Sequence, residues 1–197
     1  MNNAVKIESF SVGKIAFLDN VFDDSQWENI EILISEISRE PGLLEAISKG
    51  QGALEQSNFS LYLYRFISRQ NGISSVIDSI YTKMLMRLIE HSNLMAQISE
   101  LAKQDLRILR MQLNIMREGG FVDSHIDYDS DNAYISSVMI QAGSEYIGGN
   151  FIIYDDEGKP QVIHRVNRSI MVMSSRSLHE VERIQKGLRC TICLFCG

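Results

Sequence analysis

A histidine and an aspartate two residues apart are the part of the sequence best suited to hold a metal ion. They lie in the stretch Ser124-His125-Ile126-Asp127. A strand would project both side chains from one face, whereas a helix would separate them. One imidazole and one carboxylate are two of the three ligands of the 2-His-1-carboxylate facial triad, which holds Fe(II) and leaves coordination positions open. A third ligand must come from elsewhere in the chain.

The candidates for the third ligand are the other histidines, His91, His164 and His179. His91 falls in a helical pattern, while the other two lie among predicted strands. Arg189 follows His179 by ten residues, with Thr191 on the same face of a predicted strand. A guanidinium helped by a hydroxyl is suited to a bidentate grip on a carboxylate. The combination of His179 with Arg189 and Thr191 therefore favours His179 as the third ligand.

The composition limits the class of protein. The chain has 197 residues, of which 45% are hydrophobic and 22% charged, which predicts one domain spanning residues 1–197. The net charge of -6 argues against nucleic acid as a partner. The residues from Met1 to Lys6 do not resemble a secretory leader, and no segment approaches 18 uninterrupted apolar residues. We therefore expect a cytoplasmic protein without membrane attachment; the sequence predicts no oligomeric state.

The first half of the chain reads mainly as helical support. Ser25 to Glu28 have the form of a capping box, and apolar residues at spacings of three and four follow until Pro41-Gly42. A second helical pattern runs from about Ser75 to Leu101, with a break at 91–93. Residues 42–71 receive no predicted structure. The helix-forming part is thus 1–104.

After Asp105 the apolar period changes to 2. Between 109 and 116, apolar residues alternate with Arg110, Gln112, Asn114 and Met116, which predicts a half-buried strand. Further apolar runs lie at 134–141, 150–154, 161–166, 169–174 and 188–195. Short strands separated by turns predict a β-sandwich or barrel over 105–197, braced by the N-terminal helices.

Several motifs together resemble the 2-oxoglutarate and Fe(II)-dependent dioxygenases, in their prolyl-4-hydroxylase-like branch. The motifs are H-x-D at 125–127, H-x-V at 179–181, G-x-R at 187–189 and a Gly-Gly segment within 140–151. The resemblance covers about residues 105–197, with a fainter similarity at 17–21. It implies an α+β protein whose core is a double-stranded β-helix, a jelly-roll or cupin-like barrel.

The resemblance also implies a reaction. Fe(II) would be held by His125, Asp127 and His179, and Arg189, assisted by Thr191, would pair with the far carboxylate of 2-oxoglutarate. With O2 and supporting ascorbate, such enzymes hydroxylate an aliphatic carbon and release succinate and CO2. The substrate would be a peptide or protein side chain, or an amino-acid-like small molecule. The carboxylate of Asp127 favours hydroxylation over halogenation.

The sequence departs from this family at two tyrosine positions. Met116 and the pair Val138-Met139 stand where tyrosines often contact the co-substrate. Alternation places Asn114 and Gln112 on the face of Met116, so Asn114 is a candidate for co-substrate binding. The missing tyrosines also suggest an alternative, a non-catalytic β-barrel protein that binds or senses metal. A zinc hydrolase with the same ligands is weaker, because Arg189 would then have no role.

Three other motifs have structural interpretations. Cys190, Cys193 and Cys196 would alternate across a strand and lack a fourth thiolate, which argues against a metal cluster. Cys193 would instead be a wall residue near the iron. The acidic run at 127–131 lacks the Gly and Glu of a calcium loop, which excludes that interpretation. Asp129 and Asp131 are expected to form a solvated turn rather than a site that attracts a cationic substrate. The aromatic cluster at 62–66 is expected to pack helices on the barrel rather than to form a lid.

Overall fold

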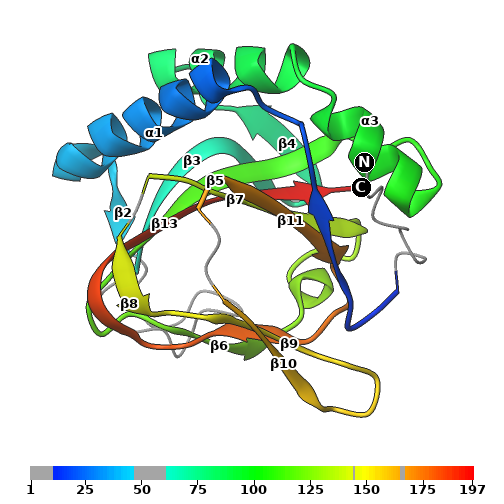
Figure 1. Ribbon diagram of the computed structural model, residues 1–197. Helices are drawn as coiled ribbons and strands as arrows, with labels where there is room; N and C mark the ends of the chain where they lie inside the picture. Colours follow the sequence, from blue (N-terminus) through cyan, green and yellow to red (C-terminus); the bar gives the residue numbers. More distant parts are fainter. Residues whose placement is uncertain (1–10, 47–60, 144, 165–166) are drawn as a thin grey trace, which may run out of the picture.

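Two antiparallel β-sheets face each other, and helices cover the outer side of the larger one (Figure 1). The computed structural model describes residues 11–46, 61–143, 145–164 and 167–197. The helices are α1 (Asp24–Arg39), α2 (Ile80–Glu90) and α3 (Leu94–Ala102), with short 3-10 turns η1 (Pro41–Leu43) and η3 (Asp127–Asp129). None of these helices is long and apolar enough to span a membrane.

The larger sheet carries most of the strands. Its order is β1 (Ile15–Leu18), β11 (Ser169–Ser174), β7 (Ser136–Gln141), β13 (Ile184–Cys196), β5 (Ile108–Arg117), β3 (Leu61–Gln70) and β2 (Glu45–Ala46). In addition, β4 (Ile73–Val76) pairs with β3, and β8 (Tyr146–Gly148) pairs with β13. The smaller sheet has the order β10 (Pro160–Ile163), β9 (Phe151–Tyr154), β12 (His179–Val181) and β6 (Val122–His125). The predicted double-stranded β-helix is confirmed, as two facing sheets rather than a closed barrel.

The alternation along β5 separates two environments. Met111, Leu113 and Ile115 are buried in the main core, which packs the larger sheet against α1, α2 and α3. The polar face, expected to be half-buried, points into the space between the sheets, where Gln112 is only 2% exposed. A strand buried on both sides but polar on one of them indicates an internal site, because buried amides need partners.

Helix α1 begins two residues earlier than the sequence predicted. Asp23, not Ser25, is the N-cap: its carboxylate accepts from the Gln26 amide at 2.8 Å, and the Gln26 side chain accepts from the Asp23 amide. The predicted apolar face is confirmed as the buried face, and the helix ends before Pro41 as expected. That face consists of Trp27, Ile30, Leu33, Ile34 and Ile37.

The first half of the chain is not helical support alone. The ten-residue strand β3 pairs directly with β5, and β4 occupies residues that we expected at the start of the second helix. At these residues, hydrogen bonding to β3 determines the structure although the local apolar spacing is helical, because tertiary pairing overrides a weak local propensity. The predicted break at 91–93 is confirmed, since α2 ends at Glu90 and α3 begins at Leu94.

The aromatic cluster packs the helices on the sheet, as predicted. Tyr64 and Phe66 are buried in the main core with their rings 5.0 Å apart, and the Tyr64 hydroxyl donates to Ser79 at the start of α2. Residues 47–60, part of the stretch without predicted structure, lie outside the described residues, as do the first ten residues and the end of the run predicted at 161–166.

Candidate active site

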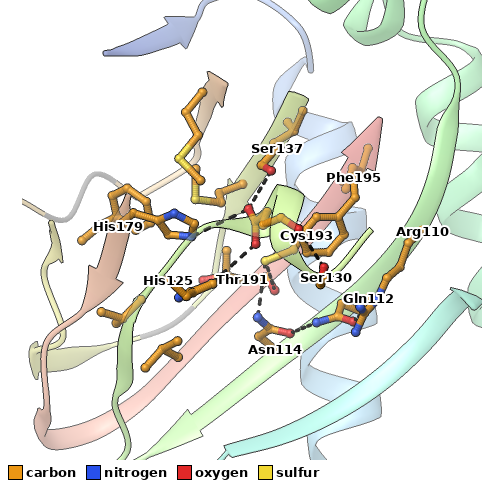
Figure 2. Close-up of a pocket in the computed structure, with 18 of the residues that line it drawn as sticks. Arg110, Gln112, Asn114, His125, Ser130, Ser137, His179, Thr191, Cys193 and Phe195 are labelled. Carbon is orange, nitrogen blue, oxygen red and sulfur yellow. Dashed lines mark hydrogen bonds and ion pairs between the residues drawn. The ribbon is translucent and has the colours of Figure 1, made fainter. Parts of the chain in front are cut away.

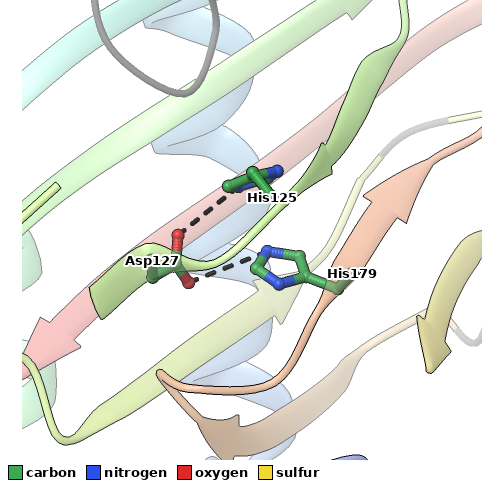
Figure 3. A group of neighbouring side chains, drawn as sticks. All are labelled: His125, Asp127 and His179. Carbon is green, nitrogen blue, oxygen red and sulfur yellow. Dashed lines mark ion pairs between the residues drawn. The ribbon is translucent and has the colours of Figure 1, made fainter. Parts of the chain in front are cut away.

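The structure brings His125, Asp127 and His179 together between the two sheets (Figure 3). His125 ends β6 and His179 begins β12, and the two residues are direct cross-strand partners. Asp127 lies in η3 rather than in the strand, but its carboxylate still turns back toward both rings. Its oxygens lie 3.5 Å from His125 Nε2 and 3.7 Å from His179 Nε2. The candidate ligand atoms all lie within 4.8 Å of one another.

Backbone carbonyls fix the orientation of both imidazoles. His125 Nδ1 lies 2.8 Å from the Asp123 carbonyl oxygen, and His179 Nδ1 lies 2.9 Å from the Ser177 carbonyl oxygen. Each Nδ1–H therefore donates to a carbonyl, which leaves the Nε2 lone pair free to bind a metal ion. The same arrangement recurs on both sides of the carboxylate.

The electrostatics prepare the three residues for a cation. Burial opposes the charged form of Asp127, but His179, His125 and the Ser137 hydroxyl lower its pKa, so it stays a carboxylate. Burial lowers the pKa of His179, which favours its neutral form. Burial opposes protonation of His125 as well, yet its hydrogen bond to Asp127 raises its pKa. Two imidazoles and one buried carboxylate fit a divalent metal ion with open positions.

Ser137 is a supporting residue that the sequence did not reveal. Its hydroxyl donates to Asp127 Oδ2 at 2.6 Å, so this oxygen is held while the carboxylate faces the histidines. Ser137 lies on β7, ten residues along the chain from Asp127, and only its position in the larger sheet places it under the carboxylate. A serine in an apolar strand gives no sequence signal for such a contact.

Removing this hydroxyl is expected to weaken metal binding without changing the ligands. We expect Ser137→Ala to lower metal affinity about 10- to 100-fold, the usual cost of losing a group that orients a ligand. The measurement is a metal titration of the purified protein with Fe(II) or Co(II). Ser136→Ala is the matched control, because its buried hydroxyl has no hydrogen-bond partner among the described residues. Equal losses in both variants would contradict the prediction.

The other two histidines lie away from this group. His91 caps the end of α2, where its Nδ1 lies 2.8 Å from the Arg87 carbonyl oxygen, as a helix-end residue should. His164 follows β10 and is exposed. Of the three candidates for the third ligand, only His179 reaches the H-x-D pair.

A cavity of about 160 Å³ opens beside the three residues, between β5, β7 and β13 on one side and the smaller sheet on the other (Figure 2). Arg189 and Thr191 line it from β13. The arginine is 3% exposed, and its Nη1 approaches Met116 Sδ at 3.8 Å. Within the described part of the chain, Arg189 Nε and Thr191 Oγ1 are buried without a hydrogen-bond partner.

These orphaned donors fit an absent anion. A buried guanidinium that has only a sulfur contact and no carboxylate among the described residues is costly, so a structure that retains one is expected to bind a negatively charged group there. The hydroxyl of Thr191 can add a second donor on the same face. A carboxylate of a small dicarboxylic acid fits this set, with its other end directed toward the metal-binding group.

The polar side chains of β5 form a chain of hydrogen bonds along the cavity (Figure 2). Arg110 Nε donates to Gln112 Oε1 at 2.8 Å, and Gln112 Nε2 donates to Asn114 Oδ1 at 2.7 Å. Asn114 Nδ2 then approaches Cys193 Sγ at 3.5 Å. Asn114 is the cross-strand partner of Thr191, which places it beside the orphaned donors. Sequence alternation indicated the face of Gln112 and Asn114, but not the link to Arg110.

The cysteines behave as interpreted from the sequence, but the acidic turn is solvated at Asp129 and not at Asp131. Cys190 and Cys196 lie in the main core, while Cys193 lines the cavity; all three are free thiols. Burial raises the pKa of Cys193 to about 12, so it remains protonated. Asp131 pairs with Arg69 at 2.5 Å, and Asp129 is exposed. Because Arg69 neutralises the Asp131 carboxylate, this turn is not suited to attract a cationic substrate.

Comparisons with known proteins agree with this geometry at the level of the fold. A scan against protein-family models finds no match, and a search of curated proteins finds none either. Solved structures do match. An oxidoreductase of the 2OG-Fe(II) oxygenase family from Burkholderia pseudomallei has a TM-score of 0.80 at 20% identity, covering 93% of this chain and 84% of its own.

Two further structures match over most of the chain. A prolyl hydroxylase from Trichoplax adhaerens, in complex with a hypoxia inducible factor peptide, has a TM-score of 0.67 at 15% identity, covering 92% of this chain and 82% of its own. EctD from S. alaskensis, with 2-oxoglutarate and 5-hydroxyectoine, has a TM-score of 0.70 at 12% identity, covering 100% and 76%. The fold is therefore that of the 2-oxoglutarate and Fe(II)-dependent oxygenases, prolyl hydroxylases included.

Proposed function

We propose that this protein is a 2-oxoglutarate- and Fe(II)-dependent dioxygenase that hydroxylates an aliphatic carbon. The overall reaction converts the substrate, 2-oxoglutarate and O2 into the hydroxylated product, succinate and CO2. One observation carries the proposal: a single cavity holds both the His-Asp-His group and the orphaned donors of Arg189 and Thr191. A site for metal alone would not need the second feature.

Each residue has a definable task in this reaction. His125, Asp127 and His179 would hold Fe(II), which supplies the oxidising chemistry when 2-oxoglutarate and O2 are bound. Arg189 and Thr191 would bind the distal carboxylate of 2-oxoglutarate and so set its direction. Asn114, beside Thr191, would donate its remaining N–H to the co-substrate, in place of the tyrosine hydroxyls that Met116 and Val138-Met139 lack.

The walls of the cavity would keep water from the reacting atoms. Phe151 packs on the His179 ring with the ring centroids 5.3 Å apart, and Met173, Met139 and Val181 complete an apolar lining. A dry site protects a strong oxidant from side reactions and strengthens the ionic contacts of Arg189. The thiol of Cys193, uncharged at neutral pH, adds to this wall.

The substrate would place only a small part in the cavity. The volume of about 160 Å³ is below the roughly 300–1,000 Å³ of pockets that enclose drug-sized ligands. A peptide side chain or an amino-acid-like molecule both fit this limit. The solved structures include one neighbour that holds a peptide and one that holds 5-hydroxyectoine, so the fold accommodates either class.

Succinate formation tests the proposal. We expect purified protein with Fe(II), ascorbate, 2-oxoglutarate and air to release succinate, and one member of a panel of amino acids and peptides to increase the rate. Omission of Fe(II) and anaerobic incubation are the controls. Metal binding without succinate formation across the panel would contradict the proposal and favour the alternative, a non-catalytic protein that binds or senses metal.

A further inference from the structure

The cavity has a second cation at the end opposite Arg189. Along the inner face of the larger sheet, β13 and β5 pair Arg189 with Met116, Thr191 with Asn114, Cys193 with Gln112, and Phe195 with Arg110. Six residues of strand separate Arg189 from Phe195, which is about 20 Å along the chain. One short dicarboxylic acid cannot contact both guanidinium groups over this distance, so Arg110 is available for a different ligand.

Arg110 lies at the level of the metal-binding group. Phe195 pairs with Arg110 on one side and with Ser137 on the other, and Ser137 donates to Asp127. The row that contains Arg110 is therefore the row beneath the carboxylate, while the row of Arg189 is farther along the strands. A ligand anchored by Arg110 would lie close to the metal, where the substrate of an oxygenase must be.

The guanidinium of Arg110 is held in place but not neutralised. Its Nε donates to Gln112 Oε1, its Cζ lies over the Phe195 ring at 5.3 Å from the ring centroid, and the Tyr134 hydroxyl is within hydrogen-bonding reach of the guanidinium. No carboxylate forms an ion pair with it in the described ranges of the chain. Glu45, the acidic group whose pKa it helps to lower, is already paired with Arg65. The terminal N–H groups of Arg110 that do not contact the Tyr134 hydroxyl thus remain for a ligand.

The neighbouring amides strengthen this preference for an acceptor. The hydrogen-bond chain uses the carbonyl oxygens of Gln112 and Asn114 as acceptors. The remaining N–H of Asn114 is assigned to the co-substrate, so one amide N–H of Gln112 is the unused donor at this end. Among the described lining residues, the charged groups are Arg110, Arg189 and Asp127, and Asp127 belongs to the metal-binding group. This end of the cavity therefore offers donors and one positive charge.

We propose that Arg110 binds a carboxylate of the primary substrate, which is accordingly an aliphatic carboxylic acid of about amino-acid size. This inference rests on the proposed oxygenase function. A guanidinium binds a carboxylate through two parallel N–H groups, and the contacts of Arg110 with Gln112 and Phe195 hold it in place for that purpose. A phosphate monoester carries about -1.5 to -2 charge at neutral pH and ordinarily engages more than one cation. One arginine at this end favours the singly charged group.

Paired ligands that differ only in charge test the inference. The probes are N-acetyl-L-valine, N-acetyl-L-leucine and N-acetyl-L-proline, each with its neutral carboxamide, and isoamyl phosphate. Binding is measured by calorimetry on the protein with Mn(II) and 2-oxoglutarate. We expect at least one acid to bind about tenfold more tightly than its amide, since charge-assisted hydrogen bonds are stronger than neutral ones. Arg110→Gln should remove this preference, and Arg110→Lys should retain part of it.

The control is Arg183→Gln, because Arg183 also stacks on an aromatic ring, that of Phe121 at 4.3 Å, but does not line the cavity. It should keep the preference of the wild-type protein. Equal binding of acid and amide in every pair, a preference that Arg110→Gln retains, or tighter binding of the phosphate would each overturn the inference. Uncoupled succinate formation by the wild-type protein is scored separately, so that loss of the oxygenase function is distinguished from loss of this substrate class.

Discussion

Replacing Asp127 with alanine is expected to abolish iron-dependent turnover. Asp127 supplies the anionic ligand of the group, and its oxygens face both histidines at 3.5 and 3.7 Å. The loss of a ligand should exceed the roughly 10- to 100-fold effect of losing a group that merely orients one. We therefore expect metal affinity to fall by more than about 100-fold. Iron content after purification and succinate formation are the two measurements.

The matched control is Asp129→Ala. Asp129 occupies the same 3-10 turn but is exposed and lies outside the metal-binding group. Circular dichroism should show that both variants keep the fold, since the apolar cores of the two layers are unchanged. Asp127→Ala protein that keeps bound iron and wild-type turnover would show that the carboxylate ligand lies elsewhere.

Replacing Arg189 with methionine is expected to remove the affinity for 2-oxoglutarate while leaving metal binding intact. Methionine keeps much of the side-chain volume and removes the charge. Truncating one partner of a buried, hydrogen-bonded charge pair costs about 2–5 kcal/mol. This corresponds to an increase of roughly 30-fold or more in the dissociation constant. The measurement is a titration of 2-oxoglutarate into metal-loaded protein, followed by its KM in succinate formation.

Replacing Thr191 with valine is expected to weaken 2-oxoglutarate binding less than replacing Arg189 does. A neutral hydrogen bond contributes about 0.5–1.5 kcal/mol, so the expected loss of 2-oxoglutarate affinity is several-fold rather than 30-fold. Arg183→Met, at an exposed position outside the cavity, should bind the co-substrate as the wild-type protein does. Unchanged co-substrate affinity in Arg189→Met would show that the orphaned guanidinium serves another ligand.

The strands that could be predicted from the sequence are those that coincide with a long run of apolar or alternating residues. The run at 169–174 is β11 at the same bounds, and β13 and β5 extend the predicted runs only slightly. β6, β8 and β12 have three or four residues each, which is too short for a periodic signal. The ten residues of β3 were missed, because both of its faces are buried and its pattern is therefore not a simple alternation.

The N-cap residue of α1 could also not be predicted from the sequence alone. The sequence predicted the cap at Ser25, and the structure uses Asp23 instead. Local chemistry permits both, since both residue types are good N-caps.

The sequence by itself determined the candidate metal ligands and the candidate anchor for a carboxylate, and the resemblance of its motifs to a known family implied the double-stranded β-helix. Arg189 and Thr191 could be identified because they share one face of a strand with period 2, whereas Asp127 reaches the histidines from a 3-10 turn that the spacing did not predict. Only the tertiary structure decided that Ser137 holds Asp127, that Arg189 Nε has no hydrogen-bond partner among the described residues, and that Arg110 lies in the row of the metal-binding group. These relations depend on strand register and on the facing of two sheets, which bring together residues far apart in the chain, and no local spacing encodes them.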